Sequence, residues 1–274
     1  MYKIVENRQL NSSVFLMKIE APLISRKIKP GQFIILRVDE FGERIPLTVA
    51  DFDGNEGTLT IIAQAIGKTT KKMSEIKVGE FISDVVGPLG KETEFGDAKK
   101  ICVIGGGVGC AIAYPSAKYL FKDGCDVDII AGFRNRDLII LEKEMGEISQ
   151  NFILVTDDGS NGKQGFVTMA LEEQLQSKEY DLVIAIGPVR MMEAVCKITK
   201  ERKIKTIVSL NPLMIDGTGM CGGCRVSVGN QVQFACVDGP DFDGHLVDFE
   251  NLIERNNKYQ EVEKHQCNLM KEEK

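Results

Sequence analysis

The chain has 274 residues, 43% hydrophobic and 27% charged, which suits a globular protein with room for two domains and a small appendage. Its formal net charge of −6 argues against a nucleic-acid or anionic-membrane partner. Residues 1–10 lack an apolar core and no apolar run approaches the length of a membrane span, so we expect a cytoplasmic protein without a secretory signal. In a reducing cytosol the eight cysteines are expected to be ligands or buried residues and not disulfides.

Residues 1–97 alternate short strand-like runs with turns, a pattern that predicts a small antiparallel β-barrel. The clearest runs are residues 14–19, 32–38 and 57–63, and residues 69–76 are predicted as a short helix.

Two segments of this predicted barrel could do chemistry, Arg44-Ile45-Pro46-Leu47-Thr48 and Gly67-Lys68-Thr69-Thr70. The second opens the predicted helix, where free N–H groups and the helix dipole favour a phosphate. Each segment is ambiguous alone. An arginine near a proline is usually a surface residue, and GKTT lacks the upstream glycine of a P-loop.

Residues 98–210 change to strand–helix alternation, which predicts an α/β domain with a doubly wound parallel sheet. Ligands of such sheets bind at the carboxyl ends of the strands. The predicted strands are residues 100–104, 126–132, 151–156, 181–187 and 205–210, with an apolar helix over residues 110–121.

A glycine cluster, Gly105-Gly106-Gly107-Val108-Gly109, joins the first of these strands to the helix. It departs from the G-x-G-x-x-G fingerprint of dehydrogenases, because the third glycine position falls on Cys110. The glycines would still let the backbone approach a pyrophosphate, although a tight strand–helix turn alone would also explain them. The expected nucleotide contacts are Gly106, Gly107, Val108, Gly109, Arg134, Asp157, Asp158, Gly187 and Pro188.

The choice between NAD(H) and NADP(H) depends on three of these residues. Asp157 and Asp158 would repel a 2′-phosphate and so favour NAD(H), whereas Arg134 would favour NADP(H).

Residues 211–274 contain a possible metal site, with Asp216, Cys221, Cys224 and Cys236 at the spacing D-x4-C-x2-C-x11-C. A plant-type 2Fe–2S site has the spacing C-x4-C-x2-C…C, and the patterns superimpose if Asp216 replaces the first cysteine. The surrounding glycines would let backbone N–H groups approach the sulfur atoms. Two alternatives stay open: a structural zinc site, which Cys-x-x-Cys also suits, and a capping or turn role for Asp216.

The rest of this segment is simpler. Residues 225–229 and 231–237 are predicted to form a hairpin that returns Cys236 to the cysteine loop. Residues 236–245 are expected to be a loop, and residues 248–269 a charged helix that is either exposed or faces a partner. Four further cysteines are predicted as buried small hydrophobes: Cys102, Cys110, Cys125 and Cys196.

The barrel and glycine motifs together resemble the ferredoxin–NADP⁺ reductase superfamily. Arg44, Pro46 and Thr48 match its R-x-(Y/P)-x-(S/T) segment, and the glycine cluster with Pro115 on the helix is similar to its GGG-x-G variant. The resemblance implies bound FAD, with Arg44 on the pyrophosphate and Thr48 as the catalytic hydroxyl beside flavin N5. Because Leu47 precedes Thr48, the aromatic stacking of other members stays open. Further flavin or phosphate contacts implied are Pro46, Leu47, Ile62, Ala63, Gln64, Gly67, Thr69 and Thr70.

Over nearly its whole length the chain resembles the electron-transfer subunits of dihydroorotate dehydrogenase B. It is similar, more closely, to the small subunits of NADH-dependent reduced ferredoxin:NADP⁺ oxidoreductase, an electron-bifurcating transhydrogenase. The first group has cysteine at the position of Asp216, and the second has one Asp with three Cys ligands.

This resemblance implies an oxidoreductase subunit that exchanges a hydride between NAD(H) and FAD and passes single electrons through a 2Fe–2S cluster. The acceptor would be a larger subunit, joined in a heterodimer, with FAD, further iron–sulfur clusters and an NADP(H) site, and ferredoxin would be reached indirectly. The alternatives are a dihydroorotate dehydrogenase B subunit, a stand-alone flavin reductase with a structural metal, and a nucleotide-sensing binding module.

Overall fold

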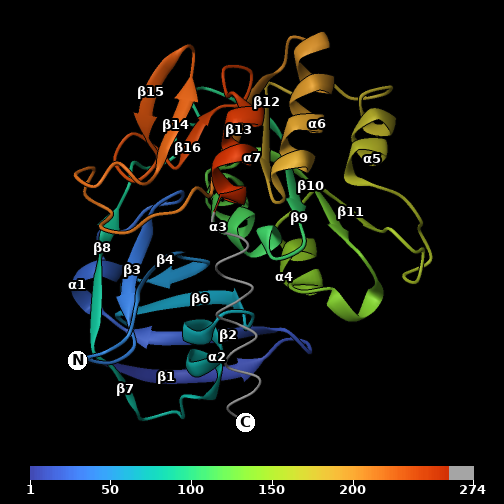
Figure 1. The fold of residues 1–274 in the computed structure, drawn as a ribbon. Helices are drawn as coiled ribbons and strands as arrows, with labels where there is room; N and C mark the ends of the chain where they lie inside the picture. Colours follow the sequence, from blue (N-terminus) through green and yellow to red (C-terminus); the bar gives the residue numbers. More distant parts are fainter. Residues whose placement is uncertain (259–274) are drawn as a thin grey trace.

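The computed structural model describes residues 1–258 and has two β-rich bodies, one above the other in Figure 1. The lower body is the N-terminal barrel, made of two antiparallel sheets with strand orders β5-β6-β2-β1-β7 and β4-β3-β8. Its elements are β1 (Tyr2–Gln9), β2 (Val14–Glu20), α1 (Pro22–Ser25), β3 (Phe33–Arg37), β4 (Arg44–Thr48), β5 (Asp51–Asp53), β6 (Thr58–Gln64), α2 (Lys68–Glu75), β7 (Phe81–Ile82) and β8 (Asp84–Leu89).

The upper body is a six-stranded sheet with the order β11-β10-β9-β12-β13-β16, parallel except for β16 at its edge. The order turns back at β9, as in a doubly wound fold. Its strands are β9 (Lys100–Gly106), β10 (Asp126–Phe133), β11 (Asn151–Thr156), β12 (Leu182–Ile186), β13 (Lys205–Ser209) and β16 (Asp241–Asp243).

Helices cover both faces of this sheet, because its central strands are hydrophobic on both sides. Ile101 and Val103 of β9 pack with α3 and α4, whereas Cys102 and Ile104 pack with α5 and α6. The helices are α3 (Gly109–Lys122), η1 (Arg136–Leu138), α4 (Glu142–Glu147), α5 (Val167–Gln174) and α6 (Val189–Glu201).

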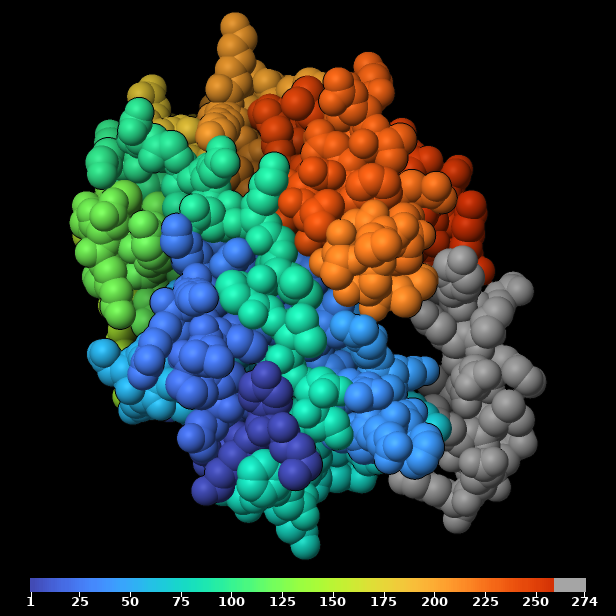
Figure 2. All heavy atoms as spheres, turned by 90° about the vertical axis from the view of Figure 1, so that its left-hand side faces the viewer, coloured from blue at the N-terminus to red at the C-terminus, as the bar shows by residue number. Residues whose placement is uncertain are grey.

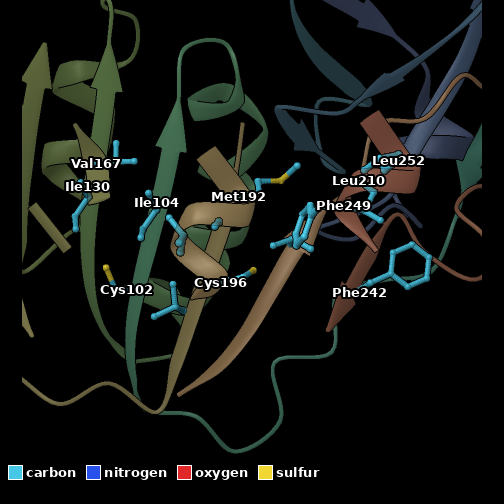
Figure 3. Packing of buried hydrophobic residues seen from close by; sticks show 14 of the residues in the cluster. Cys102, Ile104, Ile130, Val167, Met192, Cys196, Leu210, Phe242, Phe249 and Leu252 are labelled. Carbon is cyan, nitrogen blue, oxygen red and sulfur yellow. The ribbon is translucent and has the colours of Figure 1, made fainter. Parts of the chain in front are cut away.

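The C-terminal segment adds the hairpin β14 (Arg225–Val228) and β15 (Gln231–Phe234), then β16 and α7 (Phe249–Asn257). It shares one hydrophobic core with the upper sheet. Figure 3 follows this core from Ile130 and Ile104 through Met192 of α6 to Phe242 and Phe249. The cysteine loop also touches the barrel, and Figure 2 shows the orange atoms of this region against blue and teal barrel atoms.

The predicted fold class is confirmed: a barrel, a doubly wound parallel sheet and a small C-terminal cysteine segment. The four cysteines predicted to be buried, Cys102, Cys110, Cys125 and Cys196, are buried. Within residues 1–258 no helix is long and apolar enough to cross a membrane.

Two expectations for the C-terminal segment need correction. Residues 236–245 are not all loop, because β16 pairs with β13 through Ser209 and Asp241. A strand of three residues offers a single apolar position, Phe242, so no alternation was visible in the sequence. The helix starting after Asp248 is not simply exposed, since Phe249 and Leu252 are buried. Residues 259–269 of the expected helix lie outside the described residues.

Candidate functional site

A cavity of about 890 Å³ lies between the barrel and the carboxyl ends of the parallel strands. Barrel residues on one side and strand ends on the other form its walls, as the switch point of a doubly wound sheet predicts. Eleven of the predicted site residues or their neighbours line it: Thr48, Gln64, Ile66, Gly106, Gly107, Val108, Gly109, Arg134, Asp157, Gly187 and Pro188.

The glycine-rich turn brings the α3 N-terminus to the cavity. Gly107 has φ +57 and donates its N–H to Gly132 O at 2.8 Å. Val108, the N-cap of α3, makes no side-chain capping hydrogen bond. Gly109 packs against β12 so closely that a Cβ there would lie 2.4 Å from Ile186 O. The first turn of α3 is thus held against the sheet with its backbone available to an anionic group.

The barrel side presents Thr48, at the end of β4, and the free edge of β6. Ala65 donates to Ser13 O, so by strand alternation the N–H groups of Gln64 and Ile62 point away from β2. On that side β5 pairs only with residues 58–60. These backbone groups fit a planar polar ligand such as the flavin pyrimidine. Ile62 and Ala63 are buried in hydrophobic cores, and among predicted residues 62–64 only Gln64 lines the cavity.

A second set of predicted residues lies at the start of β4 and of α2. Thr69 Oγ1 donates to Glu43 Oε2 at 3.1 Å, which brings exposed Arg44 beside the N-terminus of α2. Gly67 N donates to Thr70 Oγ1 at 3.1 Å. These residues do not line the large cavity. The structure nevertheless joins the two motifs that are about twenty residues apart in sequence. The members outside the cavity are Arg44, Pro46, Leu47, Gly67, Thr69 and Thr70.

Arg134 and Asp157 follow neighbouring strands, β10 and β11, and both line the cavity. Asp158 does not line it. Its carboxylate accepts from Ser160 N and Oγ at 3.0 and 2.6 Å, and the hydroxyl and backbone bonds lower the pKa of Asp158. The structure therefore gives Asp158 a local turn role and leaves Asp157 as the acidic residue of this pair that lines the cavity.

Asp216, Cys221 and Cys224 lie in the loop before β14, and Cys236 follows β15. The four predicted metal ligands form two hydrogen-bonded pairs. Asp216 Oδ2 accepts from Cys221 N at 2.8 Å and Oδ1 from Thr218 N at 2.9 Å, and these backbone hydrogen bonds lower the pKa of Asp216. Cys236 N donates to Cys224 Sγ at 3.4 Å. Burial, with the neighbouring Cys224 thiol, raises the pKa of Cys236 to about 12.

This loop has the donors that an iron–sulfur cluster needs. Gly223 N donates to Cys221 Sγ at 3.4 Å, and the chain turns through positive φ at Gly217, Gly219 and Gly222. A 2Fe–2S cluster has two irons with two protein ligands each, and the two pairs of predicted ligands suit such a cluster.

The turn role that we considered for Asp216 is visible in its two hydrogen bonds. It does not exclude ligation, because a carboxylate has about four lone-pair sites.

Several cavity residues had no motif to reveal them. Ser209 ends β13 and Leu210 and Asn211 follow it, and the rule that ligands bind at strand ends could have found them. Asn11, in the β1–β2 turn, donates to Leu138 O at 3.2 Å, and no local pattern indicates this contact.

Comparisons with known proteins divide the chain in the same way. A family model described as the iron–sulfur cluster binding domain of dihydroorotate dehydrogenase B matches residues 211–248. A model described as an oxidoreductase NAD-binding domain matches residues 103–197. The upper sheet is thus an NAD-binding domain and the cysteine loop lies in an iron–sulfur domain.

Relatives match over nearly the whole chain. The dihydroorotate dehydrogenase B (NAD⁺) electron transfer subunit homolog of Thermotoga maritima is 44% identical, covering 96% of this chain and 93% of its own. The corresponding electron transfer subunit of Shouchella clausii is 30% identical, covering 87% and 94%. A solved chain, reported with insights into flavin-based electron bifurcation from the NADH-dependent reduced ferredoxin-NADP oxidoreductase structure, is 42% identical. It has a TM-score of 0.91 and covers 96% of this chain and 95% of its own.

Proposed function

Since the chain belongs to the family of the dihydroorotate dehydrogenase B electron transfer subunits, we propose that it exchanges a hydride between NAD(H) and FAD and passes single electrons through a 2Fe–2S cluster to a larger subunit. FAD supplies the conversion between a two-electron hydride and single electrons when it is bound. The observation that carries this function is the cavity, in which Thr48 of the barrel and Pro188 of the NAD-binding domain line the same space.

The residues of the chain bind and orient the reactants. Gly106, Gly107 and the α3 N-terminus hold the NAD(H) pyrophosphate, and Gly187 with Pro188 faces the nicotinamide. Arg44 and the α2 N-terminus hold the FAD phosphates. Their positive charge and free N–H groups favour anions there.

Thr48 donates or accepts a hydrogen bond at the flavin N5 edge, and the free edge of β6 meets the flavin ring. Because the contact lies between two bodies, the cavity walls limit the access of water to it. Residues 1–97, 98–210 and 211–274 are the FAD, NAD(H) and cluster segments in this proposal.

The nucleotide preference follows from the cavity walls. Asp157 faces the nucleotide and would accept hydrogen bonds from ribose hydroxyls, which favours NAD(H) over NADP(H). Arg134 lines the same wall, and its positive charge would attract the 2′-phosphate of NADP(H). Arg134 therefore opposes the preference for NAD(H) that Asp157 gives.

The partner is a larger subunit with its own FAD, further iron–sulfur clusters and an NADP(H) site. Ferredoxin exchanges electrons with that subunit and so with this chain only indirectly. The ligand set supports an NADH-dependent ferredoxin:NADP⁺ oxidoreductase, because Asp216 with three cysteines is typical of that type. The second candidate is a dihydroorotate dehydrogenase B subunit, which the family model over residues 211–248 favours.

The test is the visible and EPR spectrum of anaerobically purified protein, with iron and zinc counts. We expect flavin bands and a 2Fe–2S signal that responds to NADH. Bound flavin with zinc and no iron would overturn the proposal in favour of a flavin reductase with a structural metal. Co-purification of the native complex separates the two partner types by the substrate that the larger subunit oxidises.

A further inference from the structure

Arg255, near the C-terminal end of α7, contacts the cysteine loop. Its Nη2 donates to Gly223 O at 3.1 Å. Its Nε is buried and, among the described residues, makes no hydrogen bond. A buried guanidinium N–H without an acceptor is costly, since the group stays charged. The fold therefore holds the Arg255 guanidinium in this position despite the cost of an unmade hydrogen bond.

The residue that Arg255 contacts lies between two predicted cluster ligands. Gly223 separates Cys221 from Cys224, and its own N–H donates to Cys221 Sγ at 3.4 Å. The two hydrogen bonds and the Gly223 residue between them form a continuous path from the guanidinium to the Cys221 sulfur. The length of this path places the guanidinium within about 10 Å of that sulfur. The cation is therefore within electrostatic reach of anything bound there.

The position of Arg255 is set by packing. Leu252, one turn earlier in α7, is 1% exposed and belongs to the same hydrophobic core as Cys224 and Cys236. The α7 N-terminus is capped by Asp248, whose Oδ1 accepts from Asn251 N at 3.0 Å. α7 is thus fixed against the loop at both the core and the cap, and it presents Arg255 to Gly223.

The charges of a bound cluster give this contact a function. Two ferric ions, two sulfides, three thiolates and one carboxylate sum to about −2, and one-electron reduction adds another negative charge. A nearby cation stabilises the reduced form more than the oxidised form. On the basis of the proposed function, we propose that Arg255 is a positioning residue that holds the Gly223 peptide and raises the reduction potential of the cluster.

The experiment is an anaerobic redox titration of the intact protein, with the cluster followed by EPR and iron counted in every sample. The variants are Arg255→Gln, which removes the charge, and Arg255→Lys, which keeps it but loses the planar fork. The matched control is Arg202→Gln. Arg202 also donates to a backbone carbonyl, Leu175 O at 3.3 Å, but beside α5 and not in the cysteine loop.

We expect Arg255→Gln to lower the ratio of reduced to oxidised cluster about tenfold at a fixed applied potential, for a charge about 10 Å away at an effective dielectric constant of about 20. For one electron this ratio corresponds to a potential about 59 mV more negative. Arg255→Lys and Arg202→Gln should stay near the wild-type ratio. A purely structural anchor would change stability or iron content but not the potential.

An Arg255→Gln protein with full iron and the wild-type potential would overturn the inference. So would an equal shift in Arg255→Lys and Arg255→Gln. If Arg255→Gln loses its iron, Arg255→Lys decides: a retained cluster at the wild-type potential supports the role of the charge, and loss or a shift of the potential contradicts it. Wild-type protein without iron would refute the proposed function itself, which is a distinct result.

Discussion

Lys118 of α3 donates to both carboxylate oxygens of Asp51 in β5, at 2.7 Å to Oδ1 and 2.6 Å to Oδ2. The ammonium also lies 5.6 Å from the centre of the Tyr114 ring. α3 begins at the glycine-rich turn and β5 belongs to the barrel. This bidentate pair therefore joins the NAD-binding domain to the barrel, the two bodies between which the cavity lies.

The Lys118–Asp51 pair should show measurable coupling. Its side chains are 26% and 35% exposed, so solvent screens the pair only in part. We expect a coupling free energy of about 1 kcal/mol from the double-mutant cycle of Lys118→Met and Asp51→Asn, measured by urea unfolding. The same cycle on Lys143 and Glu147, a far more exposed pair at 3.8 Å, should give a value near zero. Equal coupling free energies in the two cycles would contradict the claim that the Lys118–Asp51 pair stabilises the contact between α3 and β5.

Gly109→Ala should damage the NAD-binding wall. The new Cβ would lie 2.4 Å from Ile186 O and 2.7 Å from Gly187 Cα, and both are backbone atoms that cannot rotate away. We expect a loss of about 1–3 kcal/mol in the free energy of unfolding, together with weaker NADH binding. Gly146→Ala in α4 is the control, because its nearest neighbour is 4.0 Å away, and it should stabilise by about 0.5–1 kcal/mol. A Gly109→Ala protein of wild-type stability would show that α3 does not depend on this close approach.

Asp241→Asn should change the pH dependence of stability. Thr93 Oγ1 donates to Asp241 Oδ2 at 2.5 Å, and Oδ1 is buried with no partner among residues 1–258. Burial raises the pKa of Asp241, against hydrogen bonds from Ser209 and Thr93 that lower it. The folded state thus binds the proton more tightly than the unfolded chain does. The stabilising contribution of the protonated Asp241 carboxyl is fully present below the unfolded-state pKa of about 3.9. It is lost as the pH rises through the raised pKa of the folded state.

Because asparagine cannot ionise, the free energy of unfolding of Asp241→Asn relative to wild type should increase between pH 4 and pH 8. Urea unfolding across this range measures it. Asp123→Asn removes one surface carboxylate and serves as the control. A difference between Asp241→Asn and wild type that does not vary with pH would mean that Asp241 keeps its charge when folded.

Asp216→Cys should retain the cluster with a shifted potential and an altered EPR line shape, because thiolate is a softer donor than carboxylate. Asp238→Asn is the matched loop control. Its Oδ2 accepts a backbone bond from Phe234 N at 2.8 Å, as Asp216 does from Cys221, but its spacing gives it no ligand role. If Asp216→Cys loses all iron, or has the wild-type spectrum and potential, Asp216 is not a ligand.

Patterns that are local in sequence predicted the main helices and strands and supplied the candidate site residues. Alternation in residues 14–19 and 57–63, the buried run at 100–104 and the glycines after it each depend on neighbours along the chain, so β2, β6, β9 and α3 could be identified. The spacing of Cys221, Cys224 and Cys236 likewise needs only the geometry of one loop. These motifs also carried the resemblance to a family that the comparisons then confirmed.

Contacts between distant segments could be decided only by tertiary packing. The side chain of Ile62 is buried in a core while its backbone lies at a free strand edge. Asp158 accepts a hydrogen bond from Ser160, although the adjacent Asp157 lines the cavity. Arg255 reaches Gly223 across 32 residues, and Lys118 reaches Asp51 across 67. Such pairs form because separate apolar faces must share one core, and no local periodicity records which surfaces that core brings together.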